Sequence, residues 1–135
     1  MSLGRYRLES IYLLKFKFST MKEFMMLFRH VPNPAYQPSP EDIQNSLKHW
    51  QSWIGDIAAQ GKFIGTNELE SEGQTIGGDG LISDGPYAEV KEIIGGYMHV
   101  KAENLAEAVE MAKGCPIISF GGTIEIRSIA QRHYE

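Results

Sequence analysis

The chain has 135 residues, 42% hydrophobic and 22% charged, with a formal net charge of −4. Such a length holds one domain with its own apolar core, and no apolar run approaches the roughly 18 residues of a membrane-spanning helix. Cys115 is the single cysteine, which excludes an intramolecular disulfide and cysteine-based zinc sites. We therefore expect a cytoplasmic protein without a membrane partner, in which Cys115 is buried and inert.

Charge is unevenly distributed and sets the first 20 residues apart. Residues 1–22 carry five basic residues and one acidic residue, so the remainder of the chain is more acidic than the total suggests. An acidic domain argues against nucleic-acid binding, which requires clustered Lys and Arg. Residues 1–20 are interpreted as an extension, either an edge strand or upstream sequence before a natural start at Met21; a nucleic-acid or membrane arm is a third interpretation. The domain is expected at residues 21–135.

The domain is predicted to open with a strand and a helix. Phe24–Phe28 is a short apolar run, which indicates a central strand covered on both faces. Four prolines in residues 31–40 predict a loop, and Ser39 and Pro40 mark the N-cap and first residue of a helix that Gly61 ends. One stripe of this helix should be buried. The stripe consists of Ile43, Leu47, Trp50, Ile54 and Ile57.

Further strands and one more helix are predicted in the remainder. The strands are expected at residues 62–69, 74–76, 81–83, 94–101 and 123–129, with the sequence GGDG turning a hairpin. Asn104 and Glu107 form a capping-box pair that begins the second helix, which Gly114 ends. Its inner face is predicted to comprise Leu105, Ala108, Val109 and Ala112. Two helices on one face of a mainly antiparallel sheet make an α+β, ferredoxin-like fold.

The sheet face opposite the helices, here called the far face, is predicted to carry polar groups. Ile124 and Ile126 should face the helices, as should Met98 and Val100, so their neighbours in the chain point away. The residues predicted on the far face are Tyr97, His99, Glu125 and Arg127. Alternate apolar side chains of the first strand would also lie there, exposed to water in a single chain. We therefore expect a homodimer in which two far faces enclose a partly hydrated cavity.

The most distinctive segment is Asp84–Glu92, with the sequence DGPYAEVKE. Pro86 fixes its backbone φ and starts a turn. In the structural interpretation, Asp84 simply accepts backbone N–H bonds within this turn. In the functional interpretation, the turn directs Asp84, Glu89 or Lys91 at the mouth of the cavity.

The sequence DGPYAEVKEIIGGY resembles the motif that names the DGPF branch of the YCII-related family, with Tyr87 in place of the usual phenylalanine. The blocks EFMMLFRH, WQSWIGDIAAQGKFIG, AENLAEAVEMAKGCPI and GGTIEIRSI are similar to other blocks of that family, in the same order, over residues 21 to about 130. The resemblance implies a dimeric α/β-barrel built from the ferredoxin-like unit. It also implies two kinds of relative: YCII-like proteins treated as enzymes with a His–Asp pair, and DGPF proteins associated with extracytoplasmic-function sigma factors.

The His–Asp pair of the YCII-like relatives does not transfer directly. The position of their histidine in the first helix best matches Trp50, with His49 one residue away and therefore rotated by about 100°. Asp56 lies about 10.5 Å along the helix axis from His49, too far for a direct bond. We therefore expect His49 to stack on Trp53 at the helix surface.

Other ionisable residues have a structural and a functional interpretation each. His30, with Arg29, ends a central strand, where sites often form, or it lines the proline-rich loop. His99 is either an acid or base near neutral pH or a satisfied interface histidine. Arg127 either clamps a carboxylate or phosphate, or pairs with Glu125.

The leading hypothesis is a small-molecule-binding protein or enzyme with its site between the DGPY turn and the far face. The predicted catalytic residues are Asp84, His99 and Arg127. The predicted ligand-binding residues are Arg29, His30, Tyr87, Glu89, Lys91, Tyr97 and Glu125. No metal-ligand spacing or phosphate-binding glycine loop occurs, so no metal or cofactor is expected, and the chemistry would be elimination, isomerisation or hydrolysis. The alternative is a non-catalytic regulatory or interaction module linked to sigma-factor systems.

Overall fold

The computed structural model describes residues 21–84 and 92–132. The helices and strands, in chain order, are β1 (Lys22–His30), α2 (Pro40–Ala59), β2 (Phe63–Glu68), β3 (Gln74–Ile76), β4 (Ile82–Asp84), β5 (Ile93–Ala102), α3 (Leu105–Ala112), the 3₁₀ helix η1 (Pro116–Phe120) and β6 (Thr123–Ser128). The strand predicted for residues 1–20 and the turn after Asp84 fall outside the described residues. None of the described helices is both long and apolar enough to cross a membrane.

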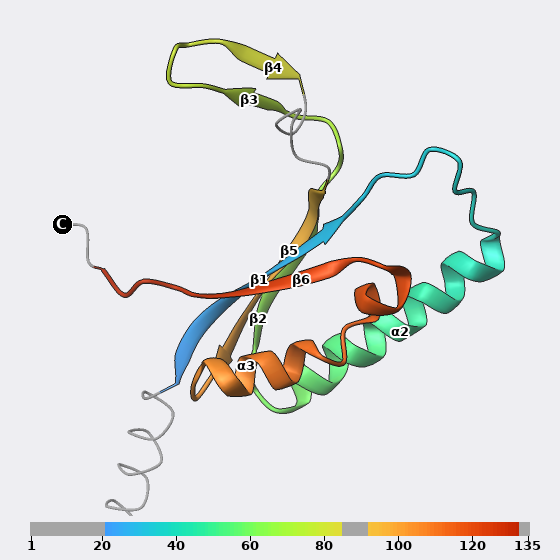
Figure 1. Cartoon of the computed structure of the whole chain (residues 1–135). Helices are drawn as coiled ribbons and strands as arrows, with labels where there is room; N and C mark the ends of the chain where they lie inside the picture. The colour runs from blue at the N-terminus through green and yellow to red at the C-terminus, as the bar shows by residue number, and fades with distance from the viewer. Residues whose placement is uncertain (1–20, 85–91, 133–135) are drawn as a thin grey trace, which may run out of the picture.

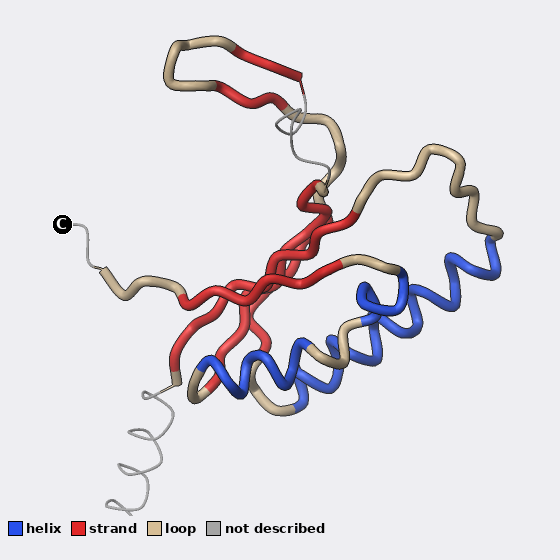
Figure 2. Tube along the Cα trace, in the orientation of Figure 1, coloured by secondary structure: helices blue, strands red, loops and turns tan. Residues whose placement is uncertain are grey.

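The main sheet has four antiparallel strands in the order β2-β5-β1-β6. Both helices lie on the same side of it, so the predicted α+β, ferredoxin-like arrangement is confirmed (Figure 1). β1 occupies an interior position between β5 and β6, as its apolar run indicated. The opposite side of the sheet carries no helix in the described part of the chain (Figure 2).

The core lies between the sheet and the helices. Along β1, Phe24, Met26 and Phe28 are buried, while the residues between them are only partly buried. On β5, Met98 and Val100 are completely buried opposite them, as the alternation predicted. At about 25 cal/mol per Å² of apolar surface, each such side chain contributes roughly 1.5–3 kcal/mol of burial free energy. Because the core lies on only one face of the sheet, the side chains on the opposite face of each strand are left for binding or for contact with another surface.

Trp53 joins the two helices. Its indole Nε1–H donates a 2.9 Å hydrogen bond to the carbonyl oxygen of Met111 at the end of α3. Its ring meets those of Phe28 and Trp50 edge to face, at centroid distances of 6.0 and 5.8 Å. Trp53 is only 8% exposed, so the prediction that it lies at the helix surface beneath His49 is wrong. The Trp53 indole faces the core because its N–H group bonds to the backbone of α3.

The predicted stripe of α2 is buried over only half of its length. Ile57 is buried and Trp50 and Ile54 pack partly against the core, but Ile43 and Leu47 are 47% and 54% exposed. The first turns of α2 extend beyond η1, away from the strands (Figure 1). A helix of 20 residues is about 30 Å long, so its first turns can extend past the part of the core that covers Trp53 and Ile57. The periodicity of apolar residues predicted the helix and its buried face, but it could not predict how far the sheet extends beneath the helix.

Most helix ends follow the predicted signals, but the C-cap of α3, Lys113, is in right-handed conformation, and Gly114 does not adopt the positive φ of the predicted glycine cap. Ser39 caps α2 as predicted, and Gly61 follows the helix with the positive φ of 71° that favours glycine. Asn104 accepts a 2.8 Å bond from the backbone N–H of Glu107 at the start of α3. The Glu107 carboxylate does not complete a capping box, because it pairs with Lys62 at 2.6 Å. Leu105, predicted on the inner face of α3, is the first residue of the helix and is 47% exposed.

The predicted hairpin is confirmed and forms a separate two-stranded sheet, β3–β4. Gly80 adopts a φ of 82°, and its N–H donates to the carbonyl oxygen of Gly77 to close the turn. The segment of residues 69–84, here called the arm, projects from the end of the main sheet (Figure 1). It turns toward the side opposite the helices. The position of the arm determines where Asp84 lies relative to the far face.

Candidate functional site

His99, Met25 and Arg127 form one row across the far face. Met25 of β1 pairs with His99 of β5 on one side and with Arg127 of β6 on the other. Strands lie about 4.8 Å apart, so the Cα atoms of His99 and Arg127 are separated by roughly 10 Å. The next row is formed by Tyr97, Leu27 and Glu125, in the same strand order. The four residues predicted on the far face are therefore brought together there, around two apolar side chains of β1.

His99 faces a carboxylate that the sequence reasoning missed. Its Nε2 lies 3.4 Å from Oε1 of Glu23, and the two side chains are 26% and 43% exposed. The Nε2 atom is shielded from solvent and makes no hydrogen bond with any residue that the structure describes. Glu23 precedes Met25 by two positions, so strand alternation was the signal that would have placed it on this face. The pair supplies a potential proton donor beside a carboxylate acceptor.

Two arginines share one carboxylate at the other edge of the far face. Glu125 Oε1 lies 3.5 Å from an Arg29 guanidinium nitrogen, and its Oε2 lies 3.8 Å from one of Arg127. The Arg127 side chain is 72% exposed, so the longer of these contacts contributes little stability. One negative charge between two guanidinium groups leaves an excess positive charge. The cluster is therefore suited to a further anion, and Arg127, the more exposed arginine, is the better placed to contact it.

Tyr97 is held at the β2 side of the same face. Its hydroxyl oxygen accepts a 2.9 Å hydrogen bond from Nδ2 of Asn67, and its backbone carbonyl accepts a 2.7 Å bond from the Thr66 hydroxyl. The side chain of Asn67 is thus a further far-face residue that sequence reasoning missed. Its position directly opposite Tyr97 follows from strand register, which the sequence does not specify.

His30 occupies the space of a missing side chain on β5. A Cβ placed on Gly95 would lie 2.7 Å from Cε1 of His30, so the imidazole lies directly against the Gly95 backbone. The pairing between β1 and β5 shifts register between Phe28 and Arg29, which is where this contact forms. This packing favours the structural interpretation of His30, although its place at the strand end is as predicted.

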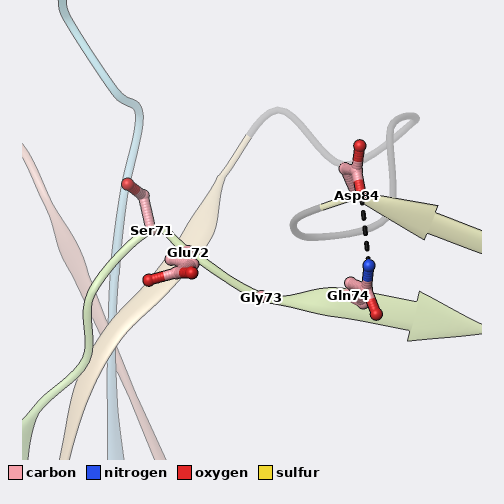
Figure 3. Close-up of a pocket in the computed structure, with 5 residues that line it drawn as sticks. All are labelled: Ser71, Glu72, Gly73, Gln74 and Asp84. Atoms are coloured by element: carbon pink, nitrogen blue, oxygen red, sulfur yellow. Dashed lines mark hydrogen bonds between the residues drawn. The ribbon is translucent and has the colours of Figure 1, made fainter.

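Asp84 lies apart from the other predicted catalytic residues. It is exposed at the end of β4, where its Oδ1 accepts a 3.3 Å bond from Nε2 of Gln74 (Figure 3). His99 is six residues along β5 from Ile93, about 20 Å at 3.3 Å per residue. Within one chain, the structure does not bring Asp84 to the row of His99 and Arg127. The sequence identified the hairpin but carried no signal for the direction in which it projects.

The surface near Asp84 is an open hollow rather than an enclosed site. It is lined by Ser71, Glu72, Gly73, Gln74 and Asp84 (Figure 3). The lining side chains are all exposed to solvent. Tyr87, Glu89 and Lys91, predicted to bind ligand, lie outside the described residues. No group of three potential metal ligands occurs in the described ranges, 21–84 and 92–132.

His49, Asp56 and Cys115 remain outside the candidate site. His49 and Asp56 are both exposed on α2, whose inner face belongs to the core. Cys115 is 3% exposed, and burial raises the pKa of its thiol to about 11, so the prediction of a buried cysteine is confirmed. At neutral pH it is a protonated thiol, which is a poor nucleophile.

Comparison with protein families gives a match over most of the chain. Residues 23–132 match the model of the YCII-related domain. The matched range spans β1 to the end of β6 and includes both helices and the arm. A search of curated proteins gives no match.

Proposed function

Because the chain belongs to the YCII-related family and its far face gathers ionisable groups around apolar side chains, we propose that it binds a small anionic molecule there, between two copies of the chain. The DGPY sequence supports membership of the DGPF branch in particular. The observation that carries the proposal is the row of His99, Met25 and Arg127, with Glu23 and Glu125 beside its two ends.

Apolar side chains that are partly exposed on the far face support a homodimer. Met25 and Leu27 lie at its centre and are only partly buried in the single chain. Two such faces packed together, about 10 Å apart, would remove these side chains from water and enclose the polar residues around them. A cavity that is apolar at its centre, with a few charged groups, is the usual form of a small-molecule site.

The two ends of the row have different roles in this proposal. Arg127, supported by Arg29 through their shared carboxylate Glu125, holds a carboxylate or phosphate group of the ligand. His99 donates or accepts a proton, with the Glu23 carboxylate 3.4 Å from its Nε2. If the protein is an enzyme, these groups supply acid–base chemistry of the kind used in elimination, isomerisation or hydrolysis.

Thermal-shift screening against small carboxylates and phosphates tests the proposal. We expect at least one compound to raise the melting temperature of the wild-type protein, with the shift reduced in His99→Gln and in Arg127→Gln. Lys113→Gln is the matched control, because Lys113 is an exposed cation on α3 that pairs only with Glu110 among the described residues. Shifts that are equal in all four proteins would contradict a site on the far face.

A regulatory or interaction module linked to sigma-factor systems is the second candidate. The observation that favours it is the exposed arm, whose Ile76 and Leu81 are 70% and 72% exposed. A protein partner recovered from lysate only when the arm is intact, together with no ligand in the screen, would favour this candidate over the first.

A further inference from the structure

The arm has apolar side chains that the rest of the described chain, residues 21–68 and 92–132, leaves exposed. Ile76 of β3 pairs directly with Ile82 of β4, and these residues are 70% and 60% exposed. An isolated two-stranded hairpin is marginally stable in water unless another surface packs against it. The arm's apolar residues therefore indicate a missing neighbour. The structure supplies three further observations on what that neighbour is.

The first observation is the direction of the arm. Figure 1 shows both helices on one side of the main sheet and the β3–β4 hairpin turned toward the other. At its base, the backbone N–H of Leu69 donates a 2.8 Å hydrogen bond to the carbonyl oxygen of Gly95, which ties the arm to the end of β5. The hairpin thus extends into the space that a second copy occupies in the proposed dimer.

The second observation is charge. The arm, residues 69–84, contains four acidic residues and no lysine or arginine. The far face carries three cations, Arg29, Lys101 and Arg127, against the two carboxylates of Glu23 and Glu125, and Lys101 and Arg127 are exposed. An acidic arm and a face with exposed cations attract each other, which favours contact between the arm of one copy and the far face of another.

The third observation is the distance between Asp84 and the other predicted site residues. Within one chain the base of the arm is hydrogen-bonded to Gly95, four residues or about 13 Å along β5 from His99, and the hairpin projects away from the sheet (Figure 1). We propose that the arm of each copy packs on the far face of a second copy, burying Ile76, Leu81 and Ile82 there, and that its Asp84 borders the partner's row of His99 and Arg127. This inference rests on the proposed dimer and adds to it that each site is completed by an acid from the other chain.

Intermolecular paramagnetic broadening tests the arrangement without a ligand. A spin label is attached at Gly78→Cys in a Cys115→Ala background, because a Cβ at Gly78 meets no atom within 4 Å. This copy, without isotope labelling, is mixed with a ¹⁵N-labelled copy lacking a spin label, and the two are unfolded and refolded together. Only contacts between copies then broaden the observed amide signals. A second label at Gln74→Cys reports on Asp84 itself, since the Gln74 side chain contacts it.

We expect the label at residue 78 to broaden signals of the main sheet in the ¹⁵N copy, and the label at residue 74 to broaden those of His99 and Arg127. A label at Lys113→Cys, on the helix side, should leave the same signals unchanged. A sample with twice the chain mass but no broadening on the far face would overturn the arm contact and leave the proposed dimer intact. Broadening of the far face from residue 78 but not of His99 or Arg127 from residue 74 would overturn the role of Asp84. A mass of one chain would overturn both proposals.

Discussion

His99 and Arg127 occupy the same row of the sheet, on strands that flank Met25 of β1. Each lies beside a glutamate, Glu23 for the histidine and Glu125 for the arginine. Because the apolar Met25 lies between the polar side chains of His99 and Arg127, the far face is suited both to ligand binding and to contact between copies. Substitutions in the core test the packing that positions this row. A substitution on the far face tests the contact between copies.

Removing the indole N–H of Trp53 should destabilise the protein. Trp53→Phe deletes the 2.9 Å hydrogen bond to the Met111 carbonyl and leaves that acceptor without its donor. We expect the free energy of unfolding to fall by about 1–3 kcal/mol, measured by urea denaturation. Leu47→Ala on the same helix is the control, because Leu47 is 54% exposed and its truncation should cost within about 0.5 kcal/mol. Equal losses in both variants would contradict the role assigned to Trp53.

A glycine in α2 should be replaceable with a gain in stability. Gly55 lies inside the helix and is exposed, and a Cβ added there would meet no atom within 4 Å. Gly55→Ala should raise the free energy of unfolding by about 0.5–1 kcal/mol, because alanine has the higher helix propensity. Gly122→Ala is the contrasting variant: its Cβ would lie 2.8 Å from the Arg29 carbonyl oxygen and 2.5 Å from Ile117, so it should destabilise. A stabilising Gly122→Ala would show that Gly122 approaches Ile117 and the Arg29 backbone less closely than these distances require.

The buried thiol of Cys115 should make stability depend on alkaline pH. Its pKa is raised from 9.0 to about 11, mainly by burial. As pH rises through this interval, the unfolded chain loses the thiol proton before the folded chain does, so ionisation favours unfolding. The free energy of unfolding should therefore fall with pH between 9.0 and about 11 more steeply in the wild type than in Cys115→Ala. Parallel pH profiles for the two proteins would mean that the thiol ionises equally easily in the folded state.

A charge at the centre of the far face should separate the copies. Leu27 is partly buried in the single chain and lies between Tyr97 and Glu125. Leu27→Lys would place an additional charge within the proposed contact, where it must be removed from water, while the helix-facing core is untouched. We expect the variant to have the wild-type circular dichroism spectrum and the mass of one chain. A dimeric Leu27→Lys protein would indicate that the copies meet elsewhere.

Much of the fold was predictable because its signals are local. The cap at Ser39, the glycine turn before Leu81 and the alternation of Met98 and Val100 each depend on neighbouring residues, and each was confirmed. The exposure of Ile43 could not be predicted, because it depends on where the sheet ends beneath α2.

The far-face row was predictable as a set, since alternation along β5 and β6 assigns each side chain to a face. The separation of Asp84 from that row was not, because the sequence of a hairpin determines its turn but not its direction relative to the main sheet. Glu23 was missed although the same alternation applies to it. The apolar run beginning at Phe24 placed the predicted start of the strand too late to include it.

The mass of the protein in solution tests the central claim most directly. The chain mass is 15.2 kDa, and sedimentation equilibrium or light scattering at micromolar concentration should give twice that value if two far faces pack together. A mass of 15.2 kDa under the same conditions would contradict the account, because Met25 and Leu27 would then face water and no second copy would enclose the site.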